Sequence, residues 1–239
     1  MTKSIIRALW GSHKDLKRRA KMDGDMEFIK RNVYGPDFTV YVFGKDNYKQ
    51  VIDLGFKAKL VDERSIIWPI ATAQFRHKFE VFKAASQDFD EFVFLDWDMA
   101  FVKPMPTDFW DVLAKGNEFQ AVLRQYHRRK AHWRKEELRK IPCGSFNYVR
   151  GKEVPIKLIE TWEKHNTWSE EINFARYTDE LMGGFNVDKW YERFEAPYFH
   201  FGACVRKDIT SKKPDIVQHF GQTTVNRFLI GKYKAEYFK

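Results

Sequence analysis

Long hydrophobic runs are missing from this chain of 239 residues. No stretch reaches the roughly 18 consecutive apolar residues that a membrane-spanning helix needs, so no such helix is predicted. The apolar stretch near the start is too short for a signal peptide, and Arg7 interrupts it. We therefore expect a cytoplasmic protein, although a catalytic domain cut from a longer membrane-anchored parent would look the same.

Cysteine is scarce, and linker sequences are absent. The two cysteines, Cys143 and Cys204, have a spacing that fits neither a metal-ligand set nor a disulfide framework. The sequence contains no internal repeat, no low-complexity tract and no Gly/Ser-rich linker. We therefore predict a single domain over residues 1–239.

Aromatic residues and positive charge are plentiful. Phe, Trp and Tyr make up 17 % of the chain, which is too much for a disordered protein. The formal net charge is +9, so an anionic partner is expected. Nucleic acid, an acidic membrane surface and a phosphorylated small molecule all satisfy this expectation.

Strand and helix patterns alternate over the first half of the chain. Apolar, β-rich segments predict strands at residues 4–10, 38–43, 57–61, 92–95 and 119–123. Phe spacing predicts an amphipathic helix over residues 71–85, and Thr107 is the expected N-cap of a helix through about residue 115. This alternation predicts an α/β fold with a mainly parallel sheet flanked by helices.

The second half is less regular. Its patterns predict a charged helix over residues 130–140, a strand over 145–149 and a helix over 153–165. Strand-like pieces follow at residues 198–205 and 216–220.

Two aspartates follow the apolar strand in the segment FVFLDWDMAFVK. Asp96 and Asp98 are both ionised at neutral pH, and like charges so close need a positive partner. The strand carries them to the carboxyl edge of the sheet, where ligands of such folds bind. If the chain stays extended, both carboxylates point the same way and Trp97 faces away. They could then bind Mg²⁺ or Mn²⁺ together; a solvated turn after a strand is the alternative.

The run RHKFEVFKAASQDFDEFVFLDWDMAFVKPMP, at residues 76–106, resembles the helix, strand and DxD segment of GT-A glycosyltransferases. It is similar to the glycogenin-like family 8 enzymes and related small bacterial sugar transferases. The resemblance implies a GT-A, Rossmann-like fold with a nucleotide-binding half over residues 1–125 and an acceptor-side half over 126–239. It also implies a nucleotide-sugar donor, with a UDP-sugar favoured, and an acceptor hydroxyl on a glycan or glycoconjugate.

The resemblance further implies residues that hold the donor. The first strand and its loop would cradle the base, with Trp10 either stacking on uracil or serving as a core or rim residue. A basic residue on the helix before the DxD strand would touch the donor, unless it belongs to a solvated helix face. The residues implied on this side are Ala8, Leu9, Trp10, Gly11, Arg76, Lys78 and Asp96.

A histidine near the C-terminus completes the metal site of the family. In this sequence IVQHFGQ places His219 after a short apolar strand, although its glycine follows at the second position rather than the third. An imidazole ligand would favour Mn²⁺ over Mg²⁺. Lys212, beside Lys213, would neutralise the diphosphate, unless the pair is an exposed basic turn.

Two segments match the sugar and acceptor side of the family. In CGSFNYVRG, Ser145 and Asn147 would hydrogen-bond sugar hydroxyls. In TDELMGGFN, Asp179 and Glu180 are candidate catalytic carboxylates, or else the N-cap and acidic first turn of a helix. A general base there would give inversion. The glycogenin-like resemblance favours retention, and the sequence leaves the choice open.

Two other functions are compatible with the sequence. A sugar-phosphate nucleotidyltransferase would have a similar sheet, but it would carry a Gly-rich basic loop after the first strand, and ALWGSHKDLKRR has one glycine. A nucleic-acid-binding protein would use the basic, aromatic segment 124–140. That segment is interrupted by Glu136 and Glu137 and matches no known binding motif. It could equally contact an anionic membrane surface or an acidic glycan.

Overall fold

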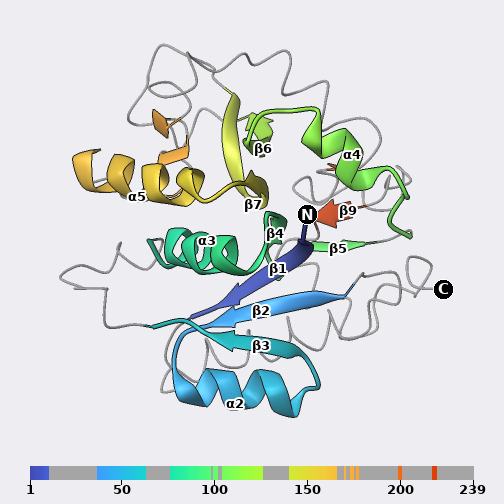
Figure 1. Cartoon of the computed structure of the whole chain (residues 1–239), viewed down its shortest axis with the longest axis vertical. Helices are drawn as coiled ribbons and strands as arrows, with labels where there is room; N and C mark the ends of the chain where they lie inside the picture. The colour runs from blue at the N-terminus through green and yellow to red at the C-terminus, as the bar shows by residue number, and fades with distance from the viewer. Residues whose placement is uncertain are drawn as a thin grey trace.

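The computed structural model describes residues 1–10, 37–62, 76–97, 99–101, 104–125, 140–165, 170, 173–174, 176–177, 199–200 and 217–219. Six strands in this part of the chain form one sheet in the order β3-β2-β1-β4-β7-β6 (Figure 1). Their bounds are β1 Lys3–Leu9, β2 Phe38–Val42, β3 Lys57–Leu60, β4 Glu91–Leu95, β6 Phe119–Gln125 and β7 Lys140–Arg150.

The sheet is mainly parallel. β1 runs parallel to β2 and to β4, and β2 runs parallel to β3. β7 is antiparallel to both of its neighbours, β4 and β6. Of these six strands only β7 therefore runs against the others, and the predicted mixed, mainly parallel sheet is confirmed.

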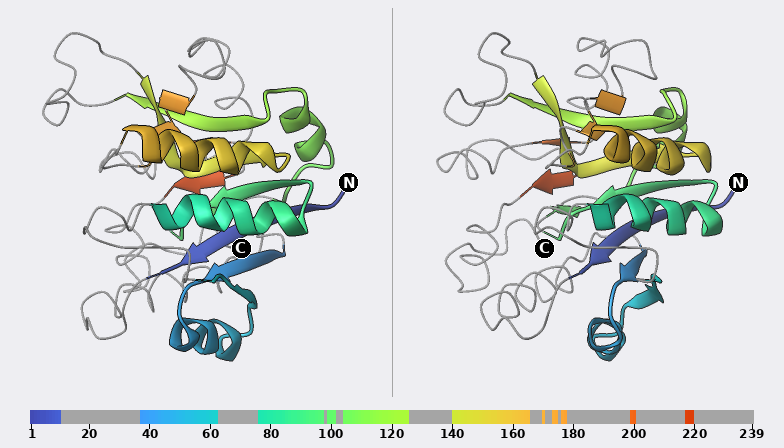
Figure 2. Two further views of the ribbon diagram at one scale, coloured as in Figure 1. Left: turned by 60° about the vertical axis from the view of Figure 1, so that its left-hand side comes forward. Right: turned by 90° about the vertical axis from the view of Figure 1, so that its left-hand side faces the viewer.

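Helices cover both faces of this sheet. α3 (Arg76–Asp88) and α5 (Glu153–His165) lie side by side on one face (Figures 1 and 2). α2 (Lys45–Asp53) packs Val51 against Leu9, Val40 and Val42, whose side chains point to the opposite face. α4 (Phe109–Ala114) precedes β6. The layered α/β architecture is the one that the sequence predicts.

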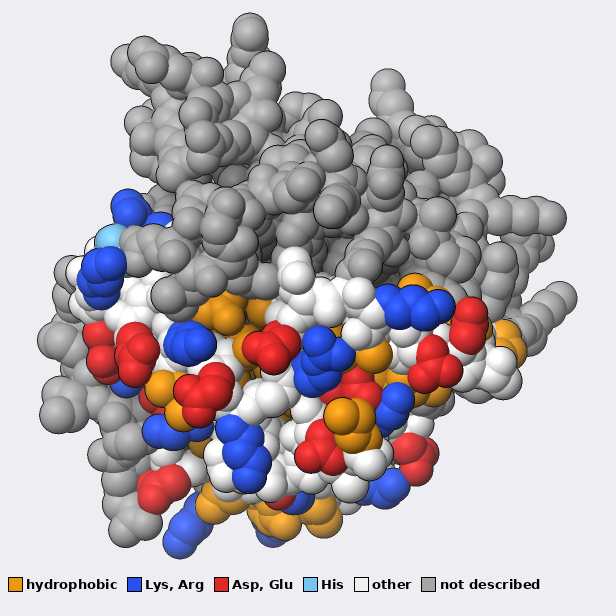
Figure 3. Space-filling view, turned by 45° about the horizontal axis from the view of Figure 1, so that its top comes forward, with side chains coloured by type: hydrophobic (Ala, Val, Ile, Leu, Met, Phe, Trp, Pro, Cys, Tyr) orange, Lys and Arg blue, Asp and Glu red, His pale blue; other side chains and the backbone are white. Residues whose placement is uncertain are grey.

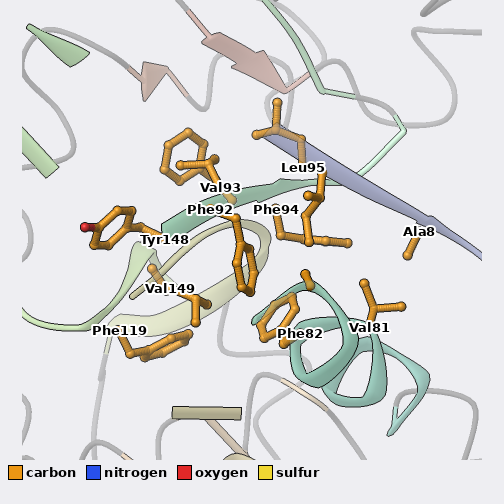
Figure 4. Packing of buried hydrophobic residues seen from close by; sticks show 14 of the residues in the cluster. Ala8, Val81, Phe82, Phe92, Val93, Phe94, Leu95, Phe119, Tyr148 and Val149 are labelled. Atoms are coloured by element: carbon orange, nitrogen blue, oxygen red, sulfur yellow. The ribbon is translucent and has the colours of Figure 1, made fainter. Parts of the chain in front are cut away.

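β4 is one of the two central strands, and all five of its residues, EFVFL, are buried. The apolar run FVFL in this strand is typical of a strand covered on both faces. Phe82 of α3 packs edge-on against Phe92 and Phe94, with ring centroids 5.6 and 5.4 Å apart (Figure 4). Truncating a phenylalanine buried in this way costs about 3–5 kcal/mol of folding free energy. These contacts fix α3 on β4, so its first turn lies over the carboxyl end of the strand.

A small second sheet lies beside the end of β4. It consists of β5 (Met99–Phe101), β9 (Val217–His219) and β8 (Phe199–His200), in the order β5-β9-β8. β5 is antiparallel to β9, and Met99 is paired with His219. A segment near the C-terminus is thereby placed directly beside the chain that follows Asp96.

Most predicted elements are confirmed within a few residues, and α5 has the predicted bounds. α2 and β5 were not predicted. Only Asn47 and Val51 of α2 are buried, and the helix contains few apolar residues that would mark it in the sequence. The structure also corrects the N-cap of α4, which is Asp108 rather than Thr107.

The predicted helix over residues 130–140 falls mostly outside the described residues. Its last residue, Lys140, is the first residue of β7, so the predicted end is wrong. β7 is correspondingly longer than the strand expected over residues 145–149. None of the described helices combines the length and the apolarity needed to cross a membrane.

Candidate active site

The order of the strands changes direction between β1 and β4. From β1 the chain continues to β2 and β3 on one side, whereas β4 and β7 lie on the other. In open α/β sheets, ligands bind at the carboxyl ends of the strands at such a switch point. β1 ends at Leu9 and β4 ends at Leu95, so Trp10 and Asp96 follow the two strand ends at this place.

Asp96 is held by its main chain, whereas its carboxylate reaches the surface. Its N–H donates to the carbonyl of Ser145 at 3.0 Å, which extends the pairing of β4 with β7 by one residue. The side chain is 35 % exposed. The Nζ of Lys78 lies 3.6 Å from its Oδ1. Lys78 is thus a positive neighbour of this aspartate within the described part of the chain.

Lys78 is a buried cation. Its side chain is 3 % exposed, and its Nζ donates to the carbonyl of Gly144 at 2.8 Å. Oε1 of Glu170 lies 3.4 Å away, and the ring centre of Phe94 lies 4.7 Å away. A buried ammonium needs such partners to offset its lost hydration. A solvated helix face is therefore the wrong interpretation for Lys78.

Gly144 allows this close approach. A Cβ at position 144 would lie 2.8 Å from both the Nζ of Lys78 and the Oε1 of Glu170. Real side chains essentially never come so close, so any larger residue would displace these groups. The glycine therefore fixes how near the buried ammonium lies to the strand.

The chain turns after Asp96 instead of continuing as a strand. The N–H of Met99 donates to the carbonyl of Asp96 at 3.1 Å, the bond that closes a β-turn. The expectation of an extended chain across the two aspartates is therefore wrong. The Trp97 ring packs edge-on against Phe38 and Phe56. Its direction relative to both carboxylates stays a prediction, because Asp98 lies outside the described residues.

Aromatic rings gather at the end of β1. Trp10 stacks on His77 of α3 with centroids 5.7 Å apart and an interplanar angle of 11°. His77 in turn meets Phe43 edge-on at 4.4 Å. Ala8 and Leu9 are buried in the core. The partly buried Trp10 is thus the candidate base contact among the described residues at this strand end.

The remaining described candidates lie close to these residues. Ser145 and Asn147 are 7 % and 0 % exposed, so their contact with a donor sugar stays a prediction. Arg76 pairs with Glu163 of α5 at 2.9 Å and with Glu80 at 3.4 Å. This arginine joins the two helices, and a role toward the donor stays a prediction for it too.

Comparison with known proteins gives matches only at the level of structure. No protein-family model matches the sequence, and no curated protein matches it. Mouse xyloside xylosyltransferase 1, in its apo form, matches with a TM-score of 0.51 and 10 % identity, over 93 % of this chain and 98 % of that one. This chain has a GT-A-like glycosyltransferase fold. At such low identity the likeness concerns the fold, and function has to be argued from the site.

Two further solved structures match with lower TM-scores. One is a glycosyltransferase involved in the glycosylation of the major capsid of PBCV-1, with a TM-score of 0.49 and 11 % identity, covering 97 % of this chain and 100 % of that one. The other is the glycosyltransferase GlyE of Streptococcus pneumoniae TIGR4, with a TM-score of 0.43 and 16 % identity. That match covers 92 % of this chain and 55 % of the GlyE chain.

Several predicted site residues lie outside the described part of this GT-A-like chain. These are Gly11, Asp98, Asp179, Glu180, Lys212 and Lys213. For His219 the structure describes the main chain, which pairs with Met99 in the small sheet. The strand expected around this histidine is confirmed, and it lies next to the turn that follows Asp96. Metal binding by His219 stays a prediction.

Sequence reasoning missed several residues around Asp96 in the GT-A-like fold. Arg7, His77, Gly144 and Glu170 were not singled out. Arg7 had a signal in the sequence, because a charge inside the apolar strand IIRAL has to find partners. Glu170 and Gly144 had none, since they meet Lys78 only through the fold.

The face of the molecule shown in Figure 3 does not single out a nucleic-acid site. In the face shown in Figure 3, the described Lys and Arg side chains are interspersed with Asp and Glu. A site for a phosphate backbone is expected to concentrate positive charge instead. Residues 126–139 of the basic segment lie outside the described residues, so its role stays a prediction, as does the cytoplasmic location.

Proposed function

We propose that this chain is a glycosyltransferase that moves a sugar from a nucleoside-diphosphate donor to an acceptor hydroxyl. A UDP-sugar is the favoured donor, and a glycan or glycoconjugate is the favoured acceptor. One observation carries the proposal: a partly exposed Asp96 lies beside the buried ammonium of Lys78 at the switch point of a GT-A-like sheet. Lys78, together with a bound metal ion, would supply positive charge for the diphosphate at this edge.

The residue types proposed for this site would suit a divalent metal ion. The Asp96 carboxylate is accessible, and the chain beyond it pairs Met99 with His219. Asp96, Asp98 and His219 would supply two carboxylates and an imidazole, a donor set that suits Mn²⁺, with Mg²⁺ as the second choice. When bound, such an ion acts as a Lewis acid that neutralises charge on the diphosphate leaving group.

The protein's own groups would orient the donor. Lys78 fixes the position of the Asp96 carboxylate and of the main chain at Gly144. Trp10, stacked on His77, would offer its ring to the base. Lys212 would lie against the diphosphate.

The acceptor step would involve Asp179 or Glu180. As a general base, one of them would take the proton of the acceptor hydroxyl, and the configuration of the anomeric carbon would be inverted. In a retaining reaction they would instead stabilise positive charge on the sugar. Analysis of the anomeric configuration of the product would decide between these routes.

A donor screen tests the proposal. Purified protein would be incubated with UDP- and GDP-sugars, with Mn²⁺, Mg²⁺ or EDTA, and release of the nucleoside diphosphate would be followed. We expect metal-dependent cleavage of a UDP-sugar that Asp96→Ala abolishes. Failure to cleave any donor with either metal and a broad set of acceptors would contradict the proposal.

A further inference from the structure

Arg7 is a buried arginine in the middle of β1. It is 2 % exposed and lies in the apolar sequence IIRAL. Its Nη1 donates to the carbonyl of Asp96, and its Nη2 donates to the carbonyl of Met99 at 2.9 Å. One guanidinium therefore holds both ends of the turn that runs from Asp96 to Met99.

Trp97 also links β1 to the turn that follows Asp96, but here the side chain belongs to the turn. Its Nε1 donates to the carbonyl of Ala8 in β1 at 2.6 Å. The Arg7 guanidinium lies 5.7 Å from the ring centre of Trp97 and 5.0 Å from that of Phe38. A side chain of β1 thus binds the main chain of the turn, while a side chain of the turn binds the main chain of β1.

We propose that Arg7 and Trp97 are positioning residues that hold this turn in the form that presents the Asp96 carboxylate to the donor and its metal ion. The proposal rests on the glycosyltransferase function proposed above. The planar guanidinium has donors arranged as a fork, so it can bind two carbonyls at once, whereas a lysine ammonium is a single point charge. Groups that orient metal ligands in this way typically change metal affinity or activity by about 10- to 100-fold.

Arg150 provides a matched control. Its Nη1 donates to the carbonyl of Ala114 at 2.8 Å, and its Nη2 to that of Gly116 at 3.4 Å, at the end of α4. Both arginines therefore hold two main-chain carbonyls of a turn. Of these two arginines, only Arg7 lies at the proposed donor site. Arg7 and Arg150 therefore make similar hydrogen bonds but in different places.

The experiment compares Arg7→Met, Arg7→Lys and Arg150→Met in the full chain. Calorimetry measures the affinity for UDP with Mn²⁺, and amide hydrogen exchange measures protection of the Met99 N–H. We expect Arg7→Met to weaken UDP binding by about 10- to 100-fold and to speed Met99 exchange. Arg7→Lys should recover part of both. Arg150→Met should lower the melting temperature but keep the affinity within about twofold, because the site is distant.

Trp97→Phe is the milder variant if Arg7→Met does not fold. It keeps an aromatic ring but loses the N–H that binds Ala8, and we expect UDP affinity to fall about tenfold. Wild-type affinity in Arg7→Met or, if it does not fold, in Trp97→Phe would overturn the proposal. Unchanged Met99 exchange in that variant, or an equal loss of affinity in Arg150→Met, would overturn it too. A wild type that binds no nucleotide would instead refute the proposed function; Met99 exchange would then still decide whether Arg7 holds the turn.

Discussion

The amino ends and the carboxyl ends of β1 and β4 bury charges of opposite sign. At the amino ends the acid is buried: Glu91 is 1 % exposed, with the Nζ of Lys3 at 3.0 Å and the hydroxyl of Tyr148 donating to its other oxygen at 2.5 Å. At the carboxyl ends the cations are buried, because Arg7 and Lys78 are each 2 % exposed. Of the two acids that lie beside Lys78 there, Asp96 is 35 % exposed and Glu170 is 16 % exposed.

This difference assigns separate roles to the two ends of the strands: the amino ends contribute to stability, and the carboxyl ends contribute to binding. At the amino ends, the partners of Glu91 are themselves part of the protein, so the cluster can contribute to the free energy of folding. At the carboxyl ends, buried positive charge lies under an accessible carboxylate, an arrangement suited to an anionic ligand and a cation. We therefore expect substitutions at the two ends to affect different measurements.

The largest effect is expected from Asp96→Asn. The change keeps the shape of the side chain and removes its charge, so donor turnover should fall by about 100-fold or more. Stability should change by less than about 1 kcal/mol, because the carboxylate is partly exposed. Glu91→Gln is the control at the other end, where unfolding free energy should fall and turnover per folded molecule should not. Equal losses of turnover in Asp96→Asn and Glu91→Gln would contradict separate roles for the two ends of the strands.

Gly144→Ala should have the next largest effect. The new Cβ would lie 2.8 Å from the Lys78 Nζ, so the buried ammonium has to shift away from its present position. We expect a loss of about 1–3 kcal/mol in stability and a clear loss of donor affinity. The control is Gly151→Ala, where φ is +85° and a Cβ meets nothing within 4 Å. It should cost about 1–2 kcal/mol through its backbone alone and leave donor affinity intact.

Tyr148→Phe tests the amino ends. Removing the hydroxyl leaves the buried Oε2 of Glu91 without the hydrogen bond from Tyr148, which costs about 1–3 kcal/mol of unfolding free energy. Urea denaturation would measure this loss, and calorimetry should show unchanged affinity for UDP with Mn²⁺. Weaker UDP binding would show that the two ends are coupled.

The smallest effect is a pH dependence at Tyr177, which packs edge-on against Phe119, the first residue of β6. Burial, aided by the charge of Glu118, raises the pKa of Tyr177 to about 12. The folded state then keeps a proton that the unfolded chain loses near pH 10. Stability should therefore fall as pH rises from about 10 toward about 12, by at most about 1.4 kcal/mol per pH unit.

Tyr177→Phe should flatten this alkaline fall in stability. Urea denaturation between about pH 9 and about pH 11 would compare the two proteins. If unfolding free energy falls with pH equally steeply in both proteins, the folded and unfolded states release the Tyr177 proton at the same pH.

The local parts of this architecture could be predicted from the sequence. β4 is an apolar run because both of its faces are covered, and α5 was predicted with its observed bounds because its buried residues recur at helical spacing. α2 was missed because little of it is buried. The hydrophobic pattern of a sequence reflects burial along a single helix or strand. It therefore predicts the elements themselves better than it predicts the contacts between two elements.

The site was predicted only in outline. The strand before Asp96 and the helix carrying Lys78 indicated where to look, and both residues do lie together. The turn after Asp96 and its clamp by Arg7 depend on contacts between β1 and a segment about 90 positions later. Glu170 reaches Lys78 across a similar separation. No spacing rule links residues so far apart, so the fold was needed to show them.

The most direct test of the central claim is calorimetric titration of UDP and GDP into the protein, with and without Mn²⁺. A variant carrying Asp96→Ala and Asp98→Ala would be measured beside the wild type. We predict micromolar, Mn²⁺-dependent binding of UDP to the wild type, lost in the variant. Absence of nucleotide binding under every metal condition, or equal binding by the variant, would contradict a donor site at the carboxyl ends of β1 and β4.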